Sequence, residues 1–164
     1  MTVLLEGAAR PLLIAHAVLG LAAVGASTHL AAYAVLAARG RHVRALRRFT
    51  VIAPAVVVPQ FILGLLLYPA YRVHVRLADF DRTAPILSQL FDFKEHLAAI
   101  ALAVVCAASV AGRLATPKAA ATDEAMVASA RWSVAALATA GAALIWTVAL
   151  LGLYVTARHP VGMR

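Results

Sequence analysis

The sequence predicts an all-α, polytopic membrane protein in which four transmembrane helices form an antiparallel bundle. Hydrophobic residues make up 63% of the 164 residues and charged residues only 13%. Soluble globular chains carry about 45–50% apolar and about 25% charged residues, so this composition cannot cover a soluble domain. The length corresponds to about one domain. We therefore expect residues 1–164 to form a single transmembrane domain in a lipid bilayer.

The same composition excludes a disordered chain, a secreted disulfide scaffold and a cytosolic enzyme. The one cysteine, Cys106, cannot form an internal disulfide or a cysteine-based zinc site. A net charge of +8 would suggest nucleic acid as partner of a soluble protein. Here the basic residues flank apolar runs and carry no interleaved aromatics, so we expect phospholipid headgroups, and no nucleic acid, as the anionic partner.

Four windows without Asp, Glu, Lys or Arg define the expected spans. A spanning helix needs about 20 apolar residues, and the apolar runs are continuous, which favours helices over the alternating strands of a barrel. The first window is longer than the apolar core of a signal peptide, about 7–15 residues, so we expect it to be retained. The expected spans are about 11–38, 50–71, 95–114 and 132–157.

Small residues predict how these helices pack. Ala, Gly, Ser and Thr are frequent in the first, third and fourth spans, and they allow helices to approach closely in lipid. We therefore expect one tight bundle. The second span contains Pro54, Pro59 and Gly64, which predict a kink. This kink is either simply packed or borders a cavity beside Gln60.

The connections predict the orientation. Residues 39–48 read RGRHVRALRR and contain five arginines. Lys and Arg are nearly evenly divided between the two sides, but a dense arginine cluster in a short loop is typical of the cytoplasmic side. We expect a multi-pass protein of the inner (cytoplasmic) membrane with both termini outside.

The longest connection, residues 72–94, lies on the outer side in this topology. Thr83 is predicted to cap a short helix with Pro85 in its first turn. Ile86, Leu87, Leu90 and Phe91 then share one face. We expect an interfacial helix over the mouth of the bundle, which either seals the bundle or covers a ligand.

The six histidines are the main functional signal in a chain with few other polar residues. Ligating groups within spans usually face the interior, and imidazole is a common ligand of metals and of haem iron. His16 and His96 lie at the same end of two parallel spans. We expect them either to share a ligand, as a pair that binds haem or a metal, or to be histidines that only pack in the bundle.

Other polar residues at this end are secondary candidates. His74 and Lys94 are reserve ligands, and Arg72 and Arg76 are candidates to pair with haem propionates. His74 and His159 also fit solvated histidines at helix ends. The chain has no Cys-x-x-Cys-His, which excludes covalent c-type attachment.

His29 and His42 are expected elsewhere. His29 lies about 20 Å along the first helix from His16 and about 140° around it, so the two do not share a face. We expect His29 to be a hydrogen-bonded packing residue, with Gln60 at comparable depth. His42 lies in the arginine-rich loop and is expected to be solvated.

Three stretches resemble a known family. These are Leu12–His16, Pro59–Leu66 and Lys94-Glu95-His96-Leu97. Together with the four-span layout, they resemble the small four-helix, haem-binding protoporphyrinogen oxidase family, and the layout is similar to the copper-resistance D type of membrane domain. The resemblance implies a haem ligand at His16 and the family's lysine at Lys94, with His96 standing in as a ligand.

The preferred hypothesis is a membrane protein that holds haem b near its outer face and takes part in electron transfer or a membrane redox reaction. A quinone or a periplasmic electron carrier is the candidate redox partner. The alternatives are a non-catalytic subunit or assembly factor, within a homo-oligomer or a respiratory complex, and copper or zinc handling by the outer histidines. Enzyme activity, as a membrane oxidoreductase, remains an open expectation.

Overall fold

The structure, a computed structural model, describes residues 6–115 and 124–158, which contain helices and turns and no strand. A short 3-10 turn, η1 (Glu6–Ala8), leads into α1. Four of the described helices are each long and apolar enough to cross a membrane. The predicted all-helical, four-helix architecture is therefore confirmed. The elements are α1 (Ala9–Ala38), α2 (Val43–Tyr71), η2 (Arg72–Phe80), α3 (Asp81–Thr83), α4 (Pro85–Leu114) and α5 (Glu124–Arg158).

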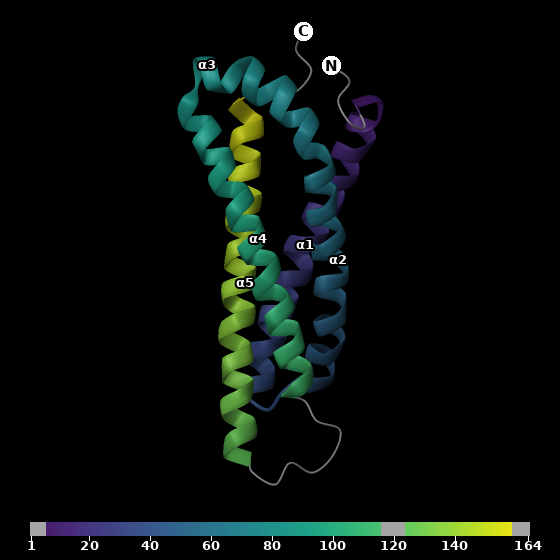
Figure 1. Cartoon of the computed structure of the whole chain (residues 1–164). Helices are drawn as coiled ribbons and strands as arrows, with labels where there is room; N and C mark the ends of the chain where they lie inside the picture. Colours follow the sequence, from purple (N-terminus) through teal and green to yellow (C-terminus); the bar gives the residue numbers. More distant parts are fainter. Residues whose placement is uncertain (1–5, 116–123, 159–164) are drawn as a thin grey trace.

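The four long helices form a closed ring of neighbours. Helix α1 packs against α2 and α5, and α4 packs against the same two helices. Successive helices run in opposite directions (Figure 1). The start of α1, the end of α5 and the segment η2–α3 lie at one end, here called the η2 end. The turn between α1 and α2 lies at the other, here called the arginine end.

The turn at the arginine end is shorter than the sequence predicts. Gly40 and His42 both have left-handed backbone conformations, with φ of 75° and 57°. Left-handed residues on both sides of Arg41 reverse the chain within a few residues. Helix α2 therefore begins at Val43 instead of near residue 50, and most of the expected arginine loop forms the first turns of this helix.

The separate interfacial helix expected around Thr83–Phe91 does not form. Pro85 is at the start of α4, where its fixed φ suits the first helical turn, and the helix then runs unbroken to Leu114. The capping position is Ala84 rather than Thr83. Beyond Tyr71 the second helix instead continues as nine residues of wider π-helix, and η2 and α3 arch across the end of the bundle (Figure 1).

Tight packing is found in the half of the bundle next to the arginine end. Its core is built mainly of alanine and valine from all four helices. At Gly112 the helices are so close that an added Cβ would lie 2.7 Å from Thr50 Cγ2 on α2. The expected close approach through small residues is thus confirmed for this half. A second, smaller core of Val75, Phe80, Phe91 and Val155 lies at the η2 end.

Between these two cores lies a layer without any fully buried side chain. It comprises residues 9–22, 58–71, 92–100 and 146–154, one segment from each long helix. Protein interiors are normally close-packed, so side chains directed inward should be buried. We call this region the loose layer. It separates the alanine-rich core from the cap formed by η2.

Candidate functional site

Polar side chains from three helices gather in the loose layer. They are His16 from α1, Gln60 and Tyr71 from α2, and Lys94 and Glu95 from α4, all half-buried. Tyr71 and Lys94 both contact the Phe91 ring, Lys94 pairs with Glu95, and His16 contacts Gln60. We call these five residues the polar cluster. Ionisable groups in membrane-spanning helices are costly and commonly mark functional sites.

His16 is held by Gln60 through both ring nitrogens. Nδ1 lies 3.2 Å from the main-chain carbonyl oxygen of Gln60, and Nε2 lies 3.3 Å from the side-chain amide nitrogen of Gln60. A neutral imidazole fits both contacts, because Nδ1–H donates to the carbonyl and Nε2 accepts from the amide. Gly64 makes room for the ring, since a Cβ there would lie 3.2 Å from His16 Cε1.

This arrangement fits an axial haem ligand. A histidine that binds a metal usually donates its other N–H to a carbonyl or carboxylate, which fixes the tautomer. The bond from His16 Nδ1 to the Gln60 carbonyl leaves the lone pair on Nε2. In the structure, this lone pair accepts a long hydrogen bond from the side-chain amide of Gln60, which is flexible. A metal bound at Nε2 would take the place of the Gln60 side-chain amide.

Lys94 and Glu95 form an ion pair within α4. The Nζ–Oε1 distance is 2.8 Å, and the two side chains keep only 16% and 27% of their surface exposed. Lys94 Nζ also lies 4.5 Å from the centre of the Phe91 ring. Withdrawing two charges from water is expensive unless they are paired. The pair therefore keeps a cation and a carboxylate in the layer that also contains His16.

Tyr71 contributes the one buried hydroxyl of the cluster. Its ring stacks on Phe91 with centroids 4.1 Å apart. The hydroxyl oxygen is buried and has no hydrogen-bond partner among the described residues. An unsatisfied buried polar group costs about 1–3 kcal/mol. A ligand with an acceptor oxygen, such as a carboxylate, would remove this cost.

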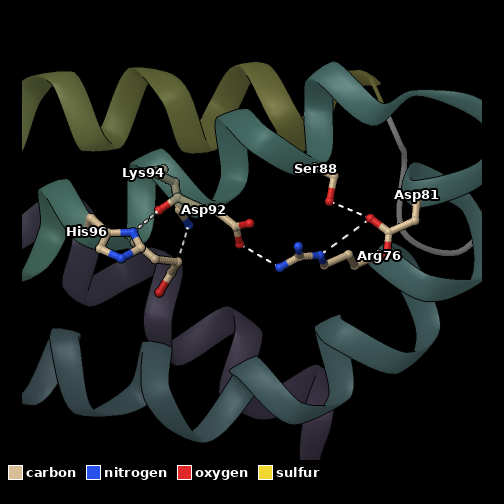
Figure 2. A network of polar contacts seen from close by, with 7 residues as sticks. Arg76, Asp81, Ser88, Asp92, Lys94 and His96 are labelled. Carbon is tan, nitrogen blue, oxygen red and sulfur yellow. Dashed lines mark hydrogen bonds and ion pairs between the residues drawn. The ribbon is translucent and has the colours of Figure 1, made fainter.

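His96, the other expected member of the pair, lies elsewhere. Its ring is exposed, and Nδ1 donates to the Asp92 carbonyl oxygen one turn earlier, at 2.7 Å (Figure 2). No interaction within the described part of the chain joins it to His16, and α1 and α4 are not direct neighbours in the ring of helices. The structure therefore brings His16 together with Gln60 instead.

Arg76 is engaged by carboxylates of the chain itself. Its Nη1 lies 2.6 Å from Asp92 on α4, and its Nε lies 3.5 Å from Asp81. Ser88 Oγ donates to the same Asp81 carboxylate at 2.6 Å. Figure 2 shows these four residues in one line between η2 and α4. This network fastens η2 to α4 and places the Arg76 guanidinium between two carboxylates of the chain.

The remaining candidates are dispersed. Arg72 and His74 are exposed on η2, and His159 lies outside the described residues. His29 donates to the Gly25 carbonyl at 2.7 Å and stacks on Phe49. Within residues 6–115 and 124–158, no three His, Cys, Asp or Glu side chains converge as a metal site would require.

The sequence did not predict that Gln60 forms hydrogen bonds with His16 instead of His29. The available signal was the spacing of Gln60 and Gly64, one helical turn apart, which places a polar side chain and a gap on one face. Comparisons with protein-family models, curated proteins and solved structures find no match for this chain.

Proposed function

We propose that this protein holds haem b in the loose layer of a membrane-spanning bundle, with His16 as an axial ligand, and transfers electrons in the membrane. The observation that carries the proposal is the hydrogen bond from His16 Nδ1 to the Gln60 carbonyl, which leaves Nε2 as the ligating atom. The partial exposure of the side chains in this layer supports it, since a ligand there would cover surface that the helices leave accessible.

The residues of the polar cluster have distinct roles in this proposal. Gln60 fixes the tautomer of His16 through its main-chain carbonyl, and Gly64 leaves space for the imidazole ring. Tyr71 and Lys94 offer a hydroxyl and an ammonium group to carboxylates of the ligand. Bound haem supplies one-electron chemistry. The redox partner is a quinone or a periplasmic carrier that meets the protein at the η2 end. We place this end at the outer face of the inner membrane.

The resemblance to the protoporphyrinogen oxidase and copper-resistance D types supports the same assignment through His16 and Lys94. His96 remains the candidate second ligand, because its Nδ1–H bond to Asp92 also leaves Nε2 available. Its exposed ring would have to turn inward to reach iron. His74 and Lys94 are the reserves.

The test is the absorption spectrum of the protein purified from haem-sufficient cells. We expect a Soret band, and visible bands that sharpen on reduction. His16→Ala should abolish these bands, whereas His42→Ala, at the other end of the bundle, should leave them unchanged. His96→Ala separates two forms of the site, because a change from low-spin to high-spin bands identifies His96 as the sixth ligand.

Colourless protein would contradict the proposal. In that case, stoichiometric copper or zinc would point to metal handling by the outer histidines. Absence of any metal would point to a non-catalytic subunit or assembly factor.

A further inference from the structure

The strongest charged surface outside the polar cluster lies at the arginine end. Arg44, Arg47 and Arg48 are exposed on the first turns of α2. Their spacing of three and four residues places them on one face of the helix. Arg39 and Arg41 in the adjoining turn are also exposed, and none of the five side chains forms an ion pair within the described residues.

The arginine face of α2 continues directly as an apolar face. Val51 and Ile52 follow Arg47 and Arg48 at the spacing of one helical turn and are exposed. Exposed apolar side chains then recur at Val58, Ile62 and Leu65. A cationic patch thus stands at the end of an apolar stripe on the same helix face.

Aromatic side chains mark the same depth. Phe49, next to Arg48, stacks on His29 with ring centroids 5.2 Å apart and lies 5.2 Å from the ring of Tyr33. Tyr33 in turn lies 6.1 Å from His42 in the turn. Aromatic residues are enriched at the level of lipid headgroups, where their rings bridge polar and apolar surroundings.

We propose that this face of α2 binds an anionic phospholipid, with its phosphate between Arg44, Arg47 and Arg48 and its acyl chains along Val51, Ile52 and Val58. Guanidinium groups bind phosphate through paired, charge-assisted hydrogen bonds. Ten residues separate Arg48 from Val58, about 15 Å of helix, which matches one leaflet of a hydrocarbon core about 30 Å thick.

The ligand is a lipid rather than free phosphate or nucleic acid, because the apolar stripe in line with the arginines complements acyl chains, which neither of these has. The site is independent of the haem proposal, since it lies at the opposite end of the molecule from the polar cluster.

The test is native mass spectrometry of delipidated protein titrated with phosphatidylglycerol or phosphatidylcholine. We expect one retained phosphatidylglycerol, with an affinity at least tenfold above that for phosphatidylcholine and reduced by high salt. The variant Arg44→Gln/Arg47→Gln/Arg48→Gln should lose this preference. The matched control Arg10→Gln/Arg82→Gln/Arg158→Gln removes the same charge at the η2 end and should retain it. Circular dichroism checks that both variants remain helical.

Three results would overturn the proposal. One is equal retention of phosphatidylglycerol by the wild type and the arginine-end variant. Another is equal loss in the control variant, which would show a general effect of net charge. The third is displacement of the lipid by inorganic phosphate at the same concentration, which would identify a plain anion site.

Discussion

At the scale of the residue, the contacts of His16 with Gln60 and Gly64 determine which ring nitrogen can bind a ligand. The sequence singled it out as a polar group in an apolar span, at the same end of the bundle as His96. What the ring does depends on Gln60 and Gly64, which set its tautomer and its space. Partners that lie on another helix depend on helix rotation and register, which composition and spacing do not determine.

Gly64→Val tests the fit of His16 against α2. The added side chain must displace the imidazole, since even a Cβ would lie 3.2 Å from its Cε1. We expect a loss of about 1–3 kcal/mol in stability, typical of overpacking. Thermal unfolding in detergent measures this loss, and the haem bands should weaken in parallel. Gly25→Val is the matched control, because no atom lies within 4 Å of a Cβ at that glycine. Equal stability of the two variants would show that the ring does not depend on this space.

The Lys94–Glu95 pair makes a second prediction at this scale. Glu95→Leu leaves the Lys94 charge unpaired and should cost roughly 1–3 kcal/mol, less than for a fully buried pair because both side chains remain partly exposed. Lys94→Met/Glu95→Leu should recover most of the loss, since it removes both charges. Unfolding by sodium dodecyl sulfate gives both values. A double variant as unstable as Glu95→Leu would refute mutual stabilisation by the pair.

At the scale of the element, the long apolar windows identified all four helices, because length and hydrophobicity suffice to predict a span. Their ends were predicted less well. Residues 43–49 and 85–94 include charged side chains and are still helical, because a helix need not end where an apolar window ends. Pro85 correctly indicated a helix start, but it begins α4 itself, and the capping position is Ala84 instead of Thr83.

The attachment of η2 to α4 gives a prediction for this element. Arg76→Gln removes its ion pairs with Asp81 and Asp92, and we expect the amides of residues 72–83 to exchange roughly fivefold faster, which corresponds to about 1 kcal/mol. Hydrogen-exchange mass spectrometry reads this segment. Arg82→Gln changes an exposed arginine of the same segment and should leave exchange unchanged. Unaltered exchange in Arg76→Gln would mean that packing of Val75 and Phe80 alone holds η2 in place.

At the scale of the whole molecule, the bundle divides into a tightly packed half and a loose half. The small residues predicted the first, where alanine and glycine let the helices meet. For the second, the sequence offered only the alternative of a cavity beside Gln60, because the meeting of polar residues from three helices in one layer depends on helix register. The shared site expected for His16 and His96 required both rings to face one point, and the periodicity of separate helices does not determine that.

The orientation of the whole chain follows from the arginine end. We expect that end to face the cytoplasm, since arginine-rich short loops are retained there. In a Cys106→Ser background, Arg82→Cys should react with an impermeant maleimide in spheroplasts of a bacterial host, and Arg41→Cys should react only after permeabilisation. Labelling in the reverse order would invert the topology and place the polar cluster nearer the cytoplasmic side.

The most direct measurement is a titration of haem into the apo-protein in lipid nanodiscs, followed by the Soret absorbance. We expect saturation at one haem per chain, and binding at least tenfold weaker in His16→Ala than in the wild type, with helical content unchanged. Binding that does not saturate, or equal affinity in the His16→Ala variant, would contradict it.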